Sequence, residues 1–150
     1  MAQHHYVECG LPNVIIEGLD PRTDDPGEAT IAIPNITALH RIIALGVVRK
    51  EGGLTGAELR FLRTEMGKTQ AELGALVHKE ALTVGRWERG ETPLDQNADA
   101  LIRFLAIELL GLEEETAGVE EVARRAVPSA SDKPIRVDGR DPKNYHLAAA

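Results

Sequence analysis

The chain has few aromatic residues and one cysteine. Of its 150 residues one is Trp, two are Tyr and two are Phe, so its core has to be built from Leu, Ile, Val and Ala. Such a composition favours packed helices over a β-sandwich, because strands are enriched in aromatic and β-branched residues. The single cysteine, Cys9, excludes an intramolecular disulfide.

Long apolar runs are also missing. No stretch approaches the roughly 20 apolar residues of a membrane-spanning helix, and the N-terminal residues lack the pattern of a secretion signal. We therefore expect a cytoplasmic protein that does not bind a membrane. Hydrophobic residues make up 43% of the chain and charged residues 27%, which is typical of a globular protein.

An excess of positive charge is absent as well, because the net charge is −7. An acidic chain argues against a nucleic-acid partner, since phosphate binding ordinarily requires a basic surface. The segment 68–89 weakens this objection. It sets Lys68, Lys79, Arg86 and Arg89 against Glu72, Glu80 and Glu88. If one of these carboxylates is paired internally, the local surface is positive.

Near its N-terminus the sequence predicts a small α/β module of two short strands and one helix. The β-branched runs at 13–19 and 28–33 indicate strands, and the Pro-, Gly- and Asp-rich segment between them indicates a solvated loop. Apolar residues then recur with helical spacing over 36–47, where Asn35 or Thr37 can cap the helix.

Two capping boxes mark helix starts further along. "TGAE" occupies 55–58 and "TQAE" occupies 69–72. In this motif the Thr hydroxyl accepts the third backbone amide of the helix, and the Glu carboxylate accepts the amide of the Thr. The first helix is expected to end at Gly67 and to bury Leu59, Leu62 and Met66. The second is expected to bury Ala71, Leu73, Leu76 and Val77.

Two more helices follow a short turn. We expect a third helix that turns Val84 and Trp87 inward and ends at Gly90, where glycine accommodates a left-handed residue. A fourth helix begins after "TPLD" (92–95) and ends at Gly111. Its apolar stripe consists of Ala98, Leu101, Ile102, Leu105 and Leu109.

Short helix, brief turn and short helix form a helix-turn-helix motif, whose second helix enters the DNA major groove. The phrase "KTQAELGALVHKEALTVGRWERGETP" (68–93) resembles the DNA-binding domain of the Xre/Cro family of phage-repressor-like regulators. The resemblance covers about 55–110 and implies a mainly α fold, a helix-turn-helix bundle behind the small N-terminal module. The residues in register with the family pattern are Gln70 and the residues of the structural core of the motif, namely Arg63, Leu73, Val84, Trp87, Glu88 and Gly90.

The resemblance and the helix geometry together predict the DNA-binding residues. Gln70 opens the second helix, where its amide can meet a phosphate, and Lys79 and Arg89 flank the same surface. The recognition helix, 80–90, presents Arg86 outward, and its guanidinium suits guanine. The expected DNA-binding set is Thr69, Gln70, Lys79, Ala81, Leu82, Thr83, Arg86 and Arg89.

Two structural expectations accompany this set. Arg63 and Glu88 should form an internal salt bridge, because both lie where the first and third helices of the bundle meet and the resemblance implies that these positions pair. One recognition helix reads few base pairs, so we expect a homodimer on two half-sites of a double-stranded operator. Its interface should lie outside the recognition helices, on apolar residues that remain after each helix has packed once: Ile42, Ile43, Phe104 and Ile107.

The predicted function is sequence-specific transcriptional regulation, as a repressor. The alternative is an antitoxin that neutralises a toxin protein and regulates its own operon. A small module ahead of a helix-turn-helix resembles the layout of MqsA-type antitoxins, although that type carries paired CxxC zinc ligands and this chain has only Cys9. His4 and His5 could complete a zinc site with Cys9, but terminal histidines are more often solvated.

No cofactor, metal or enzymatic activity is therefore expected. His40 and His78 lack a Ser or Asp partner at a catalytic spacing, and no phosphate loop is present in the sequence.

We expect three parts: the N-terminal module (1–53), the helix-turn-helix domain (54–112) and a C-terminal extension (113–150). In the extension, "EEE" (113–115) indicates a solvated helix start and is also a candidate surface for a basic toxin. Beyond it, "IRV" and "YHL" either pair as two short strands or belong to a disordered tail.

Overall fold

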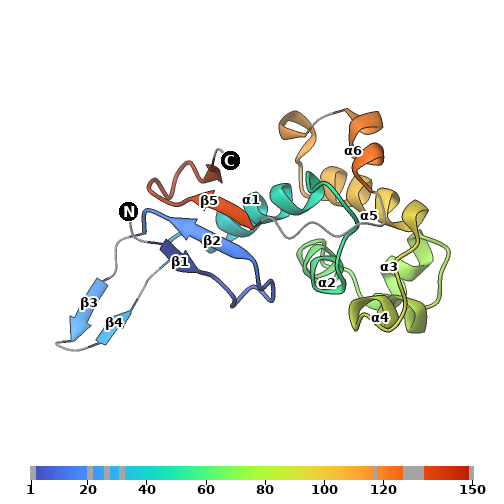
Figure 1. Ribbon diagram of the computed structural model, residues 1–150, viewed down its shortest axis with the longest axis horizontal. Coiled ribbons are helices and arrows are strands. Elements are labelled where there is room, and N and C mark those ends of the chain that lie inside the picture. Colours follow the sequence, from blue (N-terminus) through green and yellow to red (C-terminus); the bar gives the residue numbers. More distant parts are fainter. Residues whose placement is uncertain are drawn as a thin grey trace. The chain divides into compact units, whose positions relative to one another are not determined.

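The chain forms two compact units, one of strands and one of helices (Figure 1). The computed structural model describes residues 3–19, 22–25, 28–30, 33–116, 118–126 and 134–148. The strand unit combines Met1–Ile43 with Lys133–Ala150, and the helical unit is Ala44–Asp132. Helices dominate and strands are few, so the predicted mainly α fold with a small strand module is confirmed.

The strand unit contains a four-stranded sheet that joins distant parts of the chain. Its strand order is β1 (Gln3–His5), β2 (Val14–Glu17), β5 (Ile135–Asp138) and β6 (His146–Leu147). β2 runs antiparallel to β1 and parallel to β5, and β5 runs antiparallel to β6. Buried side chains alternate along the two central strands, as a sheet with one covered face requires: Val14, Ile16, Ile135 and Val137.

The strands agree with the sequence-based expectation in part. The expected strands at 13–19 and 28–33 contain β2 and β4 (Glu28–Thr30), while residues 31 and 32 lie outside the described part of the chain. The expectation of a loop between them is wrong at β3 (Arg22–Asp25), which pairs with β4. Asp is depleted in strands, so the segment reads as a loop, but backbone pairing overrides this preference.

The C-terminal residues form the strand pair rather than a disordered tail. Val137 on β5 lies opposite Leu147 on β6. Nearby, the Tyr145 hydroxyl donates to the carbonyl of Pro34 at 2.5 Å. Burial raises the pKa of this hydroxyl. These contacts tie the hairpin to the segment just before the first helix.

That helix, α1 (Ile36–Val48), starts in the strand unit and ends in the helical unit. Asn35 immediately precedes this helix, as expected for a capping residue. Its side-chain amide, however, donates to the carbonyl of Pro142 at 3.0 Å. Ile42 and Ile43 are both buried. The expectation that they leave apolar surface for a dimer is therefore wrong, because both sides of this helix segment are covered.

The helical unit is built from short helices in quick succession. They are α2 (Gly56–Glu65), α3 (Gln70–Leu76), α4 (Ala81–Glu88), α5 (Gln96–Leu109), a 3₁₀ turn (Glu113–Glu115) and α6 (Val119–Arg125). Both predicted capping boxes are present, at Thr55 and Thr69. The glycines expected to end helices, Gly67, Gly90 and Gly111, all have left-handed backbones, with φ of 71°, 73° and 65°.

The predicted core of the helical unit is correct for most residues. Leu59, Leu62, Leu73, Val77, Val84, Trp87, Ala98 and Ile102 are buried. Three residues expected in the core are exposed instead: Ala71, Leu76 and Leu109. α3 has only seven residues, so its buried face ends with Leu73, Gly74 and the capping residue Val77. Met66, Leu101 and Leu105, which were also expected in the core, are half-buried.

Two glycines permit close backbone approaches around the motif. A Cβ on Gly74 would lie 2.5 Å from the Lys79 carbonyl oxygen, so the small residue serves the turn between α3 and α4. A Cβ on Gly56 would lie 2.4 Å from the Glu88 carbonyl oxygen, where α2 begins against the end of α4. Side chains at either position would push these elements apart.

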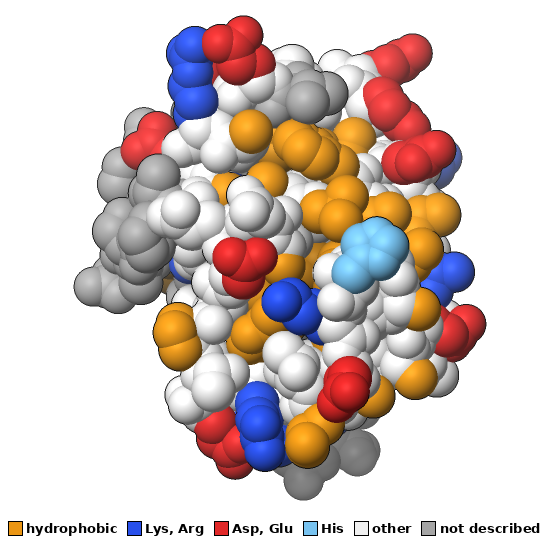
Figure 2. Space-filling view, turned by 90° about the vertical axis from the view of Figure 1, so that its right-hand side faces the viewer, with side chains coloured by type: hydrophobic (Ala, Val, Ile, Leu, Met, Phe, Trp, Pro, Cys, Tyr) orange, Lys and Arg blue, Asp and Glu red, His pale blue; other side chains and the backbone are white. Residues whose placement is uncertain are grey.

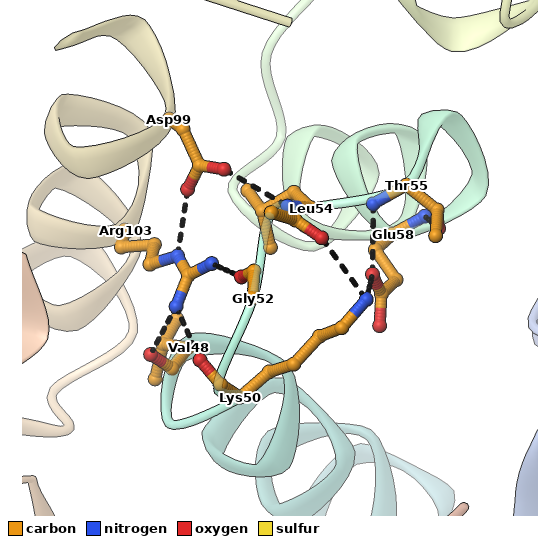
Figure 3. Close-up of polar contacts among 9 residues, drawn as sticks. Val48, Lys50, Gly52, Leu54, Thr55, Glu58, Asp99 and Arg103 are labelled. Carbon is orange, nitrogen blue, oxygen red and sulfur yellow. Dashed lines mark hydrogen bonds and ion pairs between the residues drawn. The ribbon is translucent and has the colours of Figure 1, made fainter. Parts of the chain in front are cut away.

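A buried polar network attaches the segment before α2 to α5 (Figure 3). Arg103 on α5 is fully buried. Its guanidinium donates to Asp99 at 2.7 Å, to the Lys50 carbonyl at 2.6 Å and to the carbonyl of Gly52. The other carboxylate oxygen of Asp99 accepts the amide of Leu54 at 2.9 Å. α5 thereby satisfies backbone groups that a buried connection would otherwise leave unpaired.

The same segment is anchored to α2 by a second pair. The Nζ atom of Lys50 lies 2.7 Å from Glu58 Oε1, and both side chains are largely buried. That oxygen also accepts the amide of Thr55 at 2.8 Å, as part of the first capping box. The start of α2 is thus fixed by its own cap and by the preceding residues.

Candidate nucleic-acid interface

The helix-turn-helix consists of α3, the three residues that follow its capping residue, and α4. His78 in the turn has a left-handed backbone with φ of 59°. The following amide, of Lys79, donates to the Gly74 carbonyl at 2.8 Å and closes the turn against α3. Lys79 is exposed at this corner. The turn sets α4 across α3 and leaves the predicted phosphate anchor accessible.

α4 divides into a buried face and an exposed face. Val84, Gly85 and Trp87 are buried. On the other side, Leu82 is 55% exposed and Arg86 is also exposed. The remaining members of the predicted reading set, Ala81 and Thr83, are half-buried at the flanks. The helix therefore offers one arginine and one large apolar side chain to whatever lies against it.

Arg63 and Glu88 form the predicted salt bridge. Arg63 Nε lies 2.5 Å from Glu88 Oε2, and Nη2 lies 3.1 Å from Oε1. Arg63 Nη1 also donates to the carbonyl of Lys68 at 2.9 Å, between α2 and α3. Glu88 is therefore the internally paired carboxylate that the charge argument requires, and its charge does not oppose a phosphate at the surface.

Gln70, at the first residue of α3, joins this network. Its Nε2 donates to Glu88 Oε1 at 3.2 Å. A side-chain amide carries two N–H donors, so one remains for another acceptor. Thr69, just before it, uses its hydroxyl oxygen to accept the Glu72 amide at 3.0 Å, which leaves the hydroxyl proton. Both predicted phosphate-contacting side chains thus have a fixed position and a remaining donor.

These residues surround a polar cleft of about 280 Å³. Its lining consists of Arg60, Arg63, Gln70, Gly85, Glu88 and Arg89. Arg60 was not expected there. It lies three residues before Arg63 on α2, so helical spacing places both arginines on one face. This spacing could have predicted the position of Arg60 from the sequence. Three arginines line the cleft, and Glu88, its one carboxylate, is bound to Arg63.

Arg89 at the edge of the cleft is bound to Glu91. Nε donates to Glu91 Oε1 at 3.0 Å and Nη2 donates to Oε2 at 3.2 Å. The hydrogen bonds from Arg89 lower the pKa of Glu91, and those same bonds raise the pKa of Arg89. The predicted phosphate anchor therefore has a carboxylate partner in the free protein, which the sequence-based prediction did not include.

The N-terminal histidines and Cys9 have other contacts. His4 Nε2 lies 3.9 Å from Glu8, and the ring of His5 contacts the carbonyl of Pro12. Cys9 Sγ lies 3.6 Å from the carbonyl oxygen of Tyr6. Within the described ranges, no group of three or more His, Cys, Asp or Glu side chains is arranged to hold a metal ion. His40 was considered for a catalytic role in the sequence, and its Nε2 lies 2.8 Å from the Tyr6 hydroxyl.

None of the described helices combines the length and apolar character needed to cross a membrane.

Comparison with known protein families gives a match in the middle of the chain. A family model described as helix-turn-helix matches residues 59–112, from within α2 to the residue after Gly111. The matched segment contains α3, the turn, α4 and all of α5. No curated protein and no solved structure matches the chain.

Proposed function

We propose that the protein is a sequence-specific repressor that binds its operator as a homodimer, since residues 59–112 match a helix-turn-helix family and the sequence resembles DNA-binding domains of the Xre/Cro type. The observation that carries the proposal is the exposed face of α4. It projects Leu82 and Arg86 from a helix whose other face is locked by Trp87 and Val84. Rigid presentation of a few side chains is what base readout requires.

The reading residues have distinct tasks in this proposal. Arg86 contacts guanine through two hydrogen bonds, an interaction worth about 1–3 kcal/mol of discrimination against another base. Ala81 and Leu82 offer only apolar contact, which suits the thymine methyl group. Thr83, at the flank of α4, offers a hydroxyl to a base edge or a phosphate. Specificity then rests mainly on Arg86.

Phosphate contacts come from the residues around this face. The second N–H of Gln70 and the hydroxyl of Thr69 approach one backbone segment, and Lys79 at the turn approaches another. Arg89 provides a further cation beside the cleft. Such contacts set register and affinity without reading sequence.

The dimer uses the outer face of α5. Leu101, Leu105 and Leu109 recur every four residues along this helix, with Phe104 beside them, and none of the four is buried within the chain. Leu109 is 49% exposed, and Leu76 on α3 is 42% exposed. Figure 2, which views the side of Figure 1 where α3, α4 and α5 lie, shows hydrophobic side chains gathered in a patch on this side. A patch of this kind marks an interaction surface.

A repressor is the simplest regulator for this arrangement. A dimer that occupies its operator blocks access to the DNA by steric exclusion and needs no additional contact to polymerase. We therefore favour repression over activation. The division of the chain into 1–53, 54–112 and 113–150 stays a prediction.

The second candidate is an antitoxin that neutralises a partner and regulates its own operon. The observation that favours it is the exposed acidic run Glu113–Glu115, which follows the DNA-binding domain and offers charge to a basic protein. A neighbouring reading frame encoding a small basic protein, and loss of its toxicity on co-expression with this chain, would support this candidate over a stand-alone repressor.

The decisive experiment is a selection of bound duplexes from a random pool, followed by titration of the selected site. We expect a two-fold related sequence, a Kd far below that for random duplex, and a binding curve that fits two protein chains per site. A folded protein that enriches no sequence would contradict the proposal.

A further inference from the structure

The contact between Arg89 and Glu91 lies at the edge of the proposed DNA surface. Arg89 is the capping residue at the end of α4, and Glu91 follows the left-handed Gly90. The Glu91 amide donates to the Arg86 carbonyl at 2.9 Å, so the backbone holds the carboxylate near the end of the recognition helix. Both side chains are about half exposed.

The geometry defines which edge of the Arg89 guanidinium is occupied. Nε and Nη2 both donate to the Glu91 carboxylate, one bond to each oxygen. Nη1 lies against α4, 3.0 Å from the position that a Cβ on Gly85 would occupy. An arginine clamps two oxygens of a phosphate through one such pair of parallel N–H groups. The pair best suited to that task is already occupied by Glu91.

We propose that Glu91 is an internal competitor of the DNA backbone for Arg89. In the free protein the carboxylate holds the guanidinium, and a phosphate must displace it when the operator binds. This inference rests on the proposed function, since it assigns a regulatory role at the same DNA surface. Glu91 thereby weakens binding to operator and non-operator duplexes by the same factor, so it lowers affinity without changing specificity.

Charge supports competition. The hydrogen bonds from Arg89 lower the pKa of Glu91, so the carboxylate is ionised at neutral pH. Once displaced, it would lie close to a phosphate of the same charge. Arg86 also lowers this pKa through its charge, which places Glu91 within the field of the proposed base-reading residue.

The test is a cycle of four proteins: wild type, Glu91→Gln, Arg89→Ala and the double variant. Glutamine keeps the shape of the side chain and removes its charge, and the backbone bond from residue 91 is unchanged. Glu80→Gln is the matched control, because Glu80 is an exposed acid at the start of α4 whose side chain makes no capping hydrogen bond. Each protein is titrated with the selected operator and with random duplex at several salt concentrations.

We expect Glu91→Gln to bind both duplexes about two- to fivefold more tightly at low salt, the range set by an exposed ion pair. The gain should shrink as salt rises, because the released arginine acts through phosphate charge. In the Arg89→Ala background the gain should be lost, whereas the effect of Glu80→Gln should not depend on Arg89.

Three results would overturn the inference. If Glu91→Gln tightens binding equally with and without Arg89, the carboxylate acts only by general repulsion. If Glu91→Gln weakens binding, Glu91 orients Arg89 toward the phosphate. If the folded wild type binds neither operator nor random duplex, the proposed function fails first and the inference fails with it.

Discussion

Arg63 on α2 and Glu88 on α4 are joined by two parallel hydrogen bonds, from Nε at 2.5 Å and from Nη2 at 3.1 Å. The side chains are 16% and 5% exposed, so the pair is largely removed from water. Because Gln70 also donates to Glu88, one carboxylate connects α2, α3 and α4. The position of α4 depends on this pair as well as on apolar packing.

Replacing Glu88 with Gln should therefore destabilise the fold. The substitution leaves the Arg63 guanidinium mostly buried without a charged partner, and loss of one member of a buried pair costs about 3 kcal/mol or more. Urea denaturation measures the free energy of unfolding. Glu114→Gln, at an exposed position, is the control and should change it by less than about 0.5 kcal/mol. An unchanged midpoint for Glu88→Gln would show that the pair adds no stability.

Arg103 should be the most sensitive position outside the motif. Arg103→Met retains much of the buried volume but removes the donors that satisfy Asp99 and the carbonyls of Lys50 and Gly52. We expect a loss of about 3–5 kcal/mol in the free energy of unfolding. Arg124→Met, at a side chain that is 68% exposed, should cost little. Similar losses in both variants would mean that the network contributes no more than a surface pair.

Two DNA-surface variants should behave differently. Arg86→Ala should relax base preference at one position in each half-site, by about 1–3 kcal/mol, because it removes a base contact. Lys79→Ala should weaken binding to all sequences alike and lower the salt slope by about one unit per half-site, because it removes a phosphate contact. Titrations against single-base variants of the operator at two salt concentrations separate the two effects. If Arg86→Ala resembles Lys79→Ala, Arg86 contacts a phosphate.

The dimer prediction is tested by placing a charge on α5. Leu105→Glu should convert the protein to a monomer at tens of micromolar, because a buried unpaired carboxylate is strongly unfavourable in an apolar interface. Light scattering gives the mass in solution. Leu82→Glu is the control for an added charge, since Leu82 is a large exposed residue on α4, outside the proposed interface. A wild-type monomer without DNA would contradict this interface.

The hairpin of β5 and β6 should lose stability in acid. Hydrogen bonds from Arg140 lower the pKa of Asp138 to about 2. The unfolded chain therefore takes up this proton at a higher pH, so the stabilisation is complete above about pH 4 and is lost as pH falls toward 2. Asp138→Asn should be less stable than wild type near pH 6, and the difference should shrink between about pH 4 and 2. Denaturant midpoints measured across this range check the sign.

The helix-turn-helix could be predicted from sequence because its signals are local. Thr55 and Thr69 start helices through contacts three residues away, and Gly67 and Gly90 end them through their own backbones. The spacing of Val84 and Trp87 also defined the outer face of α4. The Arg63–Glu88 pair required the family resemblance in addition, since nothing near either residue specifies the other.

Long-range contacts could not be predicted in the same way. Asp99 and Arg103 look like a solvated pair on α5, and distant backbone groups, among them the carbonyls of residues 50 and 52 and the amide of Leu54, make their burial favourable. Leu76 and Leu109 fit apolar stripes, but α3 is too short and α5 too long for the neighbouring helices to cover them. The Arg89–Glu91 contact is local, yet a charged pair two residues apart is ordinarily read as solvated surface.

The parallel pairing of β2 with β5 affects how the protein is made. Val14 is paired with Ile135, so a ribosome synthesises the entire helical unit before β2 can acquire this neighbour. The helices depend on nearby residues and can form while the chain is still emerging, and β1 can pair with β2 early, whereas the pairing of β2 with β5 has to wait for the last strands. The helical unit can therefore be complete on the nascent chain before the sheet closes.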